Sequence, residues 1–161
     1  MIKIVDGDIT DFEGDAITNA ANEGLWAGGG VCGAIFDAAG HRELSEACSR
    51  IGHCPTGEAR ITPGFNLKAK YIIQAVGPMY FNHPDPEGAL HKVYQSIIEV
   101  ARQNGIKTVA VPSISTGIFR FPLDKASKIA VEEMSKADDI EFTVYCFSYD
   151  VHLAYEEALR S

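Results

Sequence analysis

Short apolar runs alternate along the chain with longer segments in which apolar residues recur every three or four positions. The short runs are typical of buried strands, and the longer segments are typical of helices with one buried face. Six segments are therefore predicted to be strands: 2–5, 15–20, 59–62, 70–76, 108–112 and 141–147. Five are predicted to be helices: 31–39, 41–51, 88–104, 122–137 and 151–160. Strands that alternate with helices predict a mostly parallel sheet with helices on both faces, an α/β fold of three layers.

Glycines and prolines mark where these elements should end. Gly40 separates the first two predicted helices, and two prolines in segment 82–86 indicate a loop before the third. The third helix carries an apolar stripe formed by Leu90, Val93, Tyr94, Ile97, Ile98 and Ala101. Gly105 is placed to end this helix in the left-handed conformation. Because ligands of such sheets bind outside the carboxyl ends of the strands, the loops that follow the strands are the candidate site.

The composition is that of an ordinary folded domain. The chain has 161 residues, of which 46% are hydrophobic and 22% are charged, and this predicts one domain, 1–161, with a substantial core. No apolar run reaches the length of a membrane span, and Met1-Ile2-Lys3 leads straight into strand-like sequence rather than a signal peptide. We therefore expect no membrane association and a reducing, cytoplasmic location.

Charge and cysteine content argue against several classes of protein. The formal net charge of -8 argues against strong nucleic-acid binding, which depends on clustered Lys and Arg. The cysteines, Cys32, Cys48, Cys54 and Cys146, are too few for a disulfide framework in a chain of this length. Cys48, His53 and Cys54 suggest zinc, but they lack a paired C-x-x-C and a fourth ligand nearby. We expect core or surface thiols, no metal site and no cofactor.

The most informative segment is a glycine triplet between strand 15–20 and helix 31–39. Gly28, Gly29 and Gly30 carry no side chains, so peptide N–H groups can approach a phosphate or sugar diphosphate directly. The spacing Gly28-x-Gly30-x-x-Gly33 also matches the dinucleotide fingerprint of Rossmann folds. That interpretation fails because residues 21–27 separate the strand from the first glycine. In addition, segment 45–50 is helical in character where an acidic residue should end a second strand.

Two asparagines before the triplet decide the interpretation. The segments Asn19-Ala20-Ala21-Asn22 and Gly28-Gly29-Gly30-Val31 together resemble the macro domain family, whose members bind ADP-ribose. Four more segments resemble the family in the same order along the chain: Gly7-Asp8-Ile9-Thr10, Thr56-Gly57-Glu58-Ala59, Tyr71 to Pro78, and Ser113 to Phe119. The resemblance covers essentially the whole chain. It implies a three-layer α/β/α macro domain with a mixed, mostly parallel central sheet.

The resemblance also implies roles for the ligand loops. Asp8 would accept a hydrogen bond from the adenine amino group and Ile9 would add a backbone contact, unless Asp8 only caps a turn. Phe147 would stack on the adenine, unless it is a core aromatic. Two loops would hold the diphosphate and the distal ribose, and their residues are Gly28, Gly29, Gly30 and Val31 in the first and Ser115, Thr116, Gly117, Ile118 and Phe119 in the second. Arg120, where the family often has glycine, either reaches the phosphates or is solvated.

Three residues bear on catalysis. By resemblance, Asn22 would position the distal ribose through its carboxamide, with Asn19 supporting it from the strand end; alternatively, either asparagine satisfies loop backbone. Many hydrolytic members carry Asp where Cys32 stands, and a thiol is a poor substitute for a carboxylate as a base. The resemblance implies that an ordered water hydrolyses the distal-ribose linkage of mono-ADP-ribosyl-protein or O-acetyl-ADP-ribose. The alternatives are a non-catalytic reader of ADP-ribosylated protein and a phosphatase that acts on ADP-ribose phosphate.

Overall fold

The central element is a sheet of six strands. The computed structural model describes residues 1–161, and its strands are β1 Ile2–Asp6, β2 Ala16–Ala20, β3 Ala59–Pro63, β4 Tyr71–Ala75, β5 Thr108–Val111 and β6 Glu141–Cys146. They lie in the order β1-β6-β5-β2-β4-β3. Every neighbouring pair is parallel except β3 and β4, which are antiparallel. The predicted mixed, mostly parallel sheet is confirmed.

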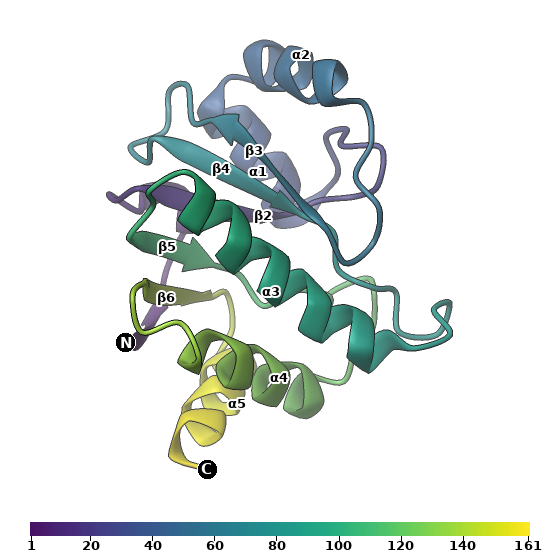
Figure 1. Ribbon diagram of the computed structural model, residues 1–161, viewed down its shortest axis with the longest axis vertical. Coiled ribbons are helices and arrows are strands. Elements are labelled where there is room, and N and C mark those ends of the chain that lie inside the picture. Colours follow the sequence, from purple (N-terminus) through teal and green to yellow (C-terminus); the bar gives the residue numbers. More distant parts are fainter.

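Helices cover both faces of this sheet. They are α1 Gly30–Ala39, α2 His41–Ile51, α3 Pro86–Gln103, α4 Leu123–Ser135 and α5 Tyr149–Arg160, with a short 3-10 turn at Ile9–Asp11. In Figure 1, α3 and α4 lie in front of the sheet and α1 lies behind it. Successive β4 residues alternate between the two sides: Ile72 packs in the cluster with α1 and α2, and Ile73 in the cluster with α3, α4 and α5. The predicted three-layer arrangement is confirmed.

Three helices begin earlier than the sequence predicts, and for α1 the difference is a single residue, Gly30. Segment 82–86 was expected to be loop, but α3 starts at Pro86 because Asp85 caps it, accepting a hydrogen bond from the Gly88 N–H at 3.1 Å. Pro86 is suited to the first turn, where its missing N–H costs nothing. Likewise α5 starts at Tyr149 instead of residue 151, because Ser148 caps it. At the other end of α3, Gly105 has φ +66, which confirms the expected left-handed position.

The sheet splits between β2 and β5, and this split opens the site. Only Ala16 and Ile17 of β2 pair with β5, at Val109 and Ala110, so the two strands part toward their carboxyl ends. After β2 the chain enters α1 on one face, and after β5 it enters α4 on the other. Such a switch point leaves a crevice at the strand ends where ligands bind. None of the helices is long and apolar enough to span a membrane.

Candidate functional site

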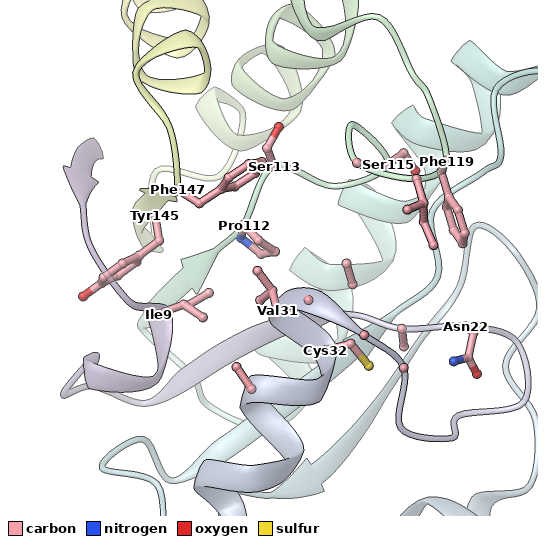
Figure 2. Close-up of a pocket in the computed structure, with 18 of the residues that line it drawn as sticks. Ile9, Asn22, Val31, Cys32, Pro112, Ser113, Ser115, Phe119, Tyr145 and Phe147 are labelled. Carbon is pink, nitrogen blue, oxygen red and sulfur yellow. The ribbon is translucent and has the colours of Figure 1, made fainter.

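A cavity of about 740 Å³ lies at the carboxyl ends of the strands. Four connections form its walls: those that follow β1, β2, β5 and β6. Figure 2 shows Phe147, Pro112 and Ile9 around one end, and Asn22 and Phe119 at the other. The predicted site residues that line it are Asp8, Ile9, Asn22, Gly28, Gly29, Gly30, Val31, Cys32, Ser115, Gly117, Ile118, Phe119 and Phe147. Asn19 and Thr116 are the two predicted site residues that do not line it.

The glycine triplet forms the wall at the start of α1. A Cβ placed on Gly29 or Gly30 would meet no atom within 4 Å, so both positions face open space. Gly29 is the N-cap of α1 and has no side-chain cap, so no side chain occupies the unpaired N–H groups of the first helical turn. Gly33 fits the loop against the helix, because a Cβ there would lie 2.7 Å from the Gly28 carbonyl oxygen. The loop therefore presents peptide N–H groups and a helix N-terminus to an anion.

The loop after β5 forms the facing wall. Ser115 has φ +67 and its carbonyl accepts a hydrogen bond from the Phe121 N–H at 2.9 Å, which turns the chain back toward α4. A Cβ on Gly117 would meet no atom within 4 Å. Thr116 turns inward instead: its hydroxyl donates to the Ser113 carbonyl at 3.1 Å and to the Ser113 hydroxyl at 2.8 Å. Thr116 therefore braces the loop from behind, which explains why it does not line the cavity.

A buried hydroxyl chain supports this second loop and was missed by the sequence analysis. The Tyr155 hydroxyl on α5 donates to the Ser113 Oγ at 3.2 Å. Burial raises the pKa of Tyr155 and also that of Tyr94 on α3, with which it is hydrogen-bonded. Both tyrosines are fully enclosed, so they stay protonated and act as fixed donors. No local sequence pattern connects residues 94, 113 and 155.

The two asparagines have different surroundings. The Asn22 carboxamide closes its own loop, since its Nδ2 donates to the Trp26 carbonyl at 2.9 Å and its Oδ1 accepts from the Trp26 N–H at 3.1 Å. One N–H and one lone pair of Asn22 remain available at the cavity. Asn19 is fully buried behind the wall, where its Nδ2 donates to the Gln74 Oε1 at 2.8 Å and to the Cys32 sulfur at 3.4 Å. Asn19 can therefore act only through Cys32 and the strand ends.

Asp8 and Phe147 stand at the opposite end from Asn22. The Asp8 Oδ1 accepts from the Thr10 N–H at 2.9 Å and the Thr10 hydroxyl at 2.7 Å, so Asp8 does cap the turn after β1. Its second carboxylate oxygen has no hydrogen bond from the protein. Phe147 is 65% exposed and points across the cavity mouth (Figure 2), so it is not a core aromatic. Tyr145, near the end of β6, also lines the wall, and the sequence did not predict it.

Comparison with known proteins identifies the family to which this fold belongs. The macro domain profile matches residues 18–130. An uncharacterised protein of Fusobacterium nucleatum is 45% identical over 99% of this chain and 95% of its own length. The chain belongs to the macro domain family.

Two related macro domains have named ligands or activities. A mutant macrodomain of Oceanobacillus iheyensis, solved with ADP-ribose, is 37% identical with a TM-score of 0.92, and the match covers 98% of this chain and 90% of that one. The ADP-ribose glycohydrolase MACROD2 of Xenopus laevis is 42% identical over 93% of this chain but only 37% of its own length.

The electrostatics of this macro domain's cavity are unusual for an anion site. No Lys or Arg lines it, and Asp8 is its only charged residue. Arg120, whose role the sequence left open, is exposed and does not line the cavity. The groups of this cavity that could attract an anion are therefore backbone N–H groups and the N-terminus of α1.

Cys32 lies in the first turn of α1 and lines the cavity of this macro domain. It is 8% exposed, and its sulfur accepts a hydrogen bond from Asn19. Behind them, Gln74 links Asn19 to Thr62, whose Oγ1 accepts from the Gln74 Nε2 at 3.4 Å. This buried row fixes the position of the thiol at the cavity wall.

Proposed function

We propose that this macro domain, residues 1–161 acting as one domain, binds ADP-ribose in the cavity and hydrolyses linkages at its distal ribose. The observation that carries the proposal is the pair of glycine-containing loops facing each other across a cavity that lacks Lys and Arg. Peptide N–H groups from both sides suit a diphosphate, whose two negative charges lie between two sugars. The related macrodomain solved with ADP-ribose supports this ligand.

The ends of the cavity suit the two halves of the nucleotide. Phe147, exposed at one end, offers a ring face for adenine, and the free oxygen of Asp8 offers an acceptor for the adenine amino group. At the other end, Asn22 keeps one N–H and one lone pair for the distal ribose hydroxyls, beside Phe119. The diphosphate would then lie between Gly28–Gly30 and Ser115–Ile118. Ser115 supplies a buried hydroxyl that has no protein partner.

The proposed reaction is hydrolysis of an ester at the distal ribose. The substrate is either a protein that carries mono-ADP-ribose on an acidic side chain or the small molecule O-acetyl-ADP-ribose. Water adds across the ester bond, so that one product carries the new hydroxyl and the other leaves as a carboxylic acid. Asn22 would hold the distal ribose in the orientation in which the ordered water can attack the ester linkage. The glycohydrolase among the relatives supports a hydrolytic role.

One observation favours a second candidate, a reader that binds ADP-ribosylated protein without turnover. The only carboxylate on the cavity wall is Asp8, which lies on the loop of Ile9, at the end opposite Asn22. No carboxylate base therefore stands at the end proposed for the distal ribose, and the titratable side chain in the first turn of α1 is the Cys32 thiol. Binding is common to both candidates, and only turnover separates them.

Calorimetry with ADP-ribose and a turnover assay on a mono-ADP-ribosylated protein test both statements. Gly29→Ala adds a Cβ into open space and should bind within a few-fold of the unaltered chain. Gly29→Glu fills the same space with a negative charge and should abolish binding. Unchanged affinity in Gly29→Glu would place the ligand elsewhere. Binding without product release over hours would contradict the proposed hydrolysis and favour the non-catalytic reader of ADP-ribosylated protein.

A further inference from the structure

A second cluster of chemically reactive side chains lies at the ends of β1 and β6, on the face of the sheet that α5 covers. Asp6 and Cys146 end these strands and are register partners, so their side chains lie side by side on one face. The helix α5 packs on that face and brings His152 between them. One ligand atom from each of the three residues lies within 4.8 Å of the others. The proposed nucleotide function uses none of these side chains.

We propose that Asp6, Cys146 and His152 form a zinc-binding site that joins β1, β6 and α5. The donor set of one carboxylate oxygen, one sulfur and one imidazole nitrogen suits Zn²⁺, whereas Mg²⁺ and Ca²⁺ prefer oxygen alone. Three protein ligands leave a fourth tetrahedral position for water.

Carboxylates hold both ring nitrogens of His152. Its Nε2 lies 2.9 Å from an oxygen of Glu156, and its Nδ1 lies 2.9 Å from an oxygen of Asp6. On metal binding Nδ1 would release its hydrogen and ligate the ion, while Glu156 would keep the hydrogen on Nε2. A carboxylate that holds the second nitrogen of a ligating histidine is a recurrent feature of zinc sites. Glu156 is itself held by Arg160, which donates to its other oxygen at 2.6 Å.

The site is accessible from one side and closed on the other. The Asp6 side chain is 68% exposed and that of His152 24% exposed, so an ion can enter between them. Cys146 is 2% exposed and forms the floor. Nitrogen and oxygen ligands of a tetrahedral zinc stand about 3.3 Å apart, so the Asp6 oxygen and the His152 Nδ1, now 2.9 Å apart, would separate slightly around the ion. The exposed Asp6 side chain is free to make this adjustment. The thiol and imidazolium protons leave to solvent when the metal binds.

A rival cluster lies on α3 and α4. His91, Glu132 and Glu133 also have ligand atoms within 4.8 Å of one another. There, however, the Lys136 ammonium lies 3.5 Å from the buried Glu133 and Gln95 donates to the same carboxylate. The charge of Glu133 is already compensated, and a nearby ammonium repels a cation. This cluster also has no sulfur, which makes the two sites distinguishable by spectroscopy.

Titration of the untagged full chain with Co²⁺, in the absence of nucleotide, tests the zinc site. We expect one ion per chain and a thiolate-to-cobalt charge-transfer band in the near ultraviolet, which Zn²⁺ should abolish by displacement. Cys146→Ser should lose the band, while the matched control Cys54→Ser, also a buried thiol, should keep it. Because Cys146→Ser removes a core thiol, His152→Gln, at a partly exposed position, provides a second test and should also lose the band.

Glu156→Gln distinguishes a supporting carboxylate from a bystander. We expect metal affinity to fall by about 10- to 100-fold, as is typical when such a partner is lost. Three results would each overturn the site: no cobalt binding, cobalt binding without the thiolate band, or a band that survives Cys146→Ser. Because ADP-ribose takes no part in the titration, failure of the zinc site and failure of the proposed nucleotide site are separate outcomes.

Discussion

At the scale of single residues, we expect Cys32 to limit the rate of the proposed hydrolysis. Its side chain sits at the wall with Asn19 donating to it. A carboxylate at this position would accept the same hydrogen bond and could also take a proton from water. General-base catalysis typically contributes about 10²- to 10⁴-fold to a rate.

Cys32→Asp should therefore raise turnover of a mono-ADP-ribosylated protein by at least about tenfold, with ADP-ribose affinity changed by only a few-fold. Cys32→Ser is the matched control, since a hydroxyl replaces the thiol with little change in shape and can accept the same hydrogen bond from Asn19, but is no base. It should bind normally and gain no turnover. Steady-state rates and calorimetry measure the two quantities, and equal rates for all three proteins would show that position 32 is catalytically idle.

Phe147 should contribute binding energy without contributing stability. Its ring is 65% exposed, so Phe147→Ala removes little packing. Stacking on a base is worth about 1–3 kcal/mol, which corresponds to a loss of roughly 5- to 150-fold in affinity. Tyr149→Ala provides the control, because Tyr149 is an exposed aromatic two residues away that does not line the cavity. If both variants bind ADP-ribose as tightly as the unaltered chain, adenine does not stack here.

Residue positions at the cavity were predicted well where they depend on the local backbone, and poorly where they depend on residues distant in the chain. A glycine lacks a side chain whatever its distant neighbours are, so Gly28–Gly30 and Gly117 could be placed on the cavity wall from sequence. Whether Asn19 faces the cavity depends on Gln74 and Cys32, which lie far from it in the chain. The grouping of Asp6, Cys146 and His152 depends on the β1–β6 register and on α5. No spacing rule could have revealed it, which is why no metal site was expected.

At the scale of elements, periodicity located all six strands and five helices, and the errors lie at their ends. Caps explain the two largest errors at helix starts: Asp85 and Ser148 each start a helix two residues earlier than its apolar stripe predicts. The stripe reports which face is buried, whereas the cap determines the first residue. The split between β2 and β5 was also not predicted, because it arises from the helices that follow each strand and not from the strands themselves.

The contact between α3 and α4 should make the free energy of unfolding depend on pH. Glu133 on α4 is buried, and it accepts from His91 at 2.6 Å and from Gln95 at 3.2 Å on α3. Burial raises the pKa of Glu133, but these hydrogen bonds and Lys136 outweigh it and lower the pKa below its usual 4.5. A carboxyl group with a lowered pKa stabilises the folded chain above pH 4.5 and loses that contribution as the pH falls through its folded value.

Glu133→Gln should therefore reduce the free energy of unfolding at pH 7 by about 1–3 kcal/mol. The difference from the unaltered chain should shrink as the pH falls below 4.5, where Glu133 itself becomes protonated. Glu132→Gln is the control on the neighbouring, largely exposed carboxylate, and it should cost less than about 0.5 kcal/mol. Urea unfolding across this pH range measures the effect. A difference that is independent of pH would assign the loss to packing and not to charge.

At the scale of the whole molecule, an acidic protein is proposed to bind an acidic ligand. The chain has a net charge of -8 and the cavity contributes no Lys or Arg. Partial charges on peptide N–H groups act over a short range and release few counterions, unlike side-chain cations, which make affinity fall steeply with salt. ADP-ribose affinity should therefore fall by less than about threefold between low and moderately high ionic strength.

Arg120 is the residue that would break this expectation. It stands exposed beside the second loop with φ +61, and a change of side-chain conformation is the only way its guanidinium could reach a phosphate. Arg120→Gln removes the charge and keeps the backbone strain, so the affinity and its salt dependence should both stay within about twofold of the unaltered chain. Calorimetry at several salt concentrations on both proteins measures this. A steep salt dependence that disappears in Arg120→Gln would mean that a side chain, and not the backbone, holds the diphosphate.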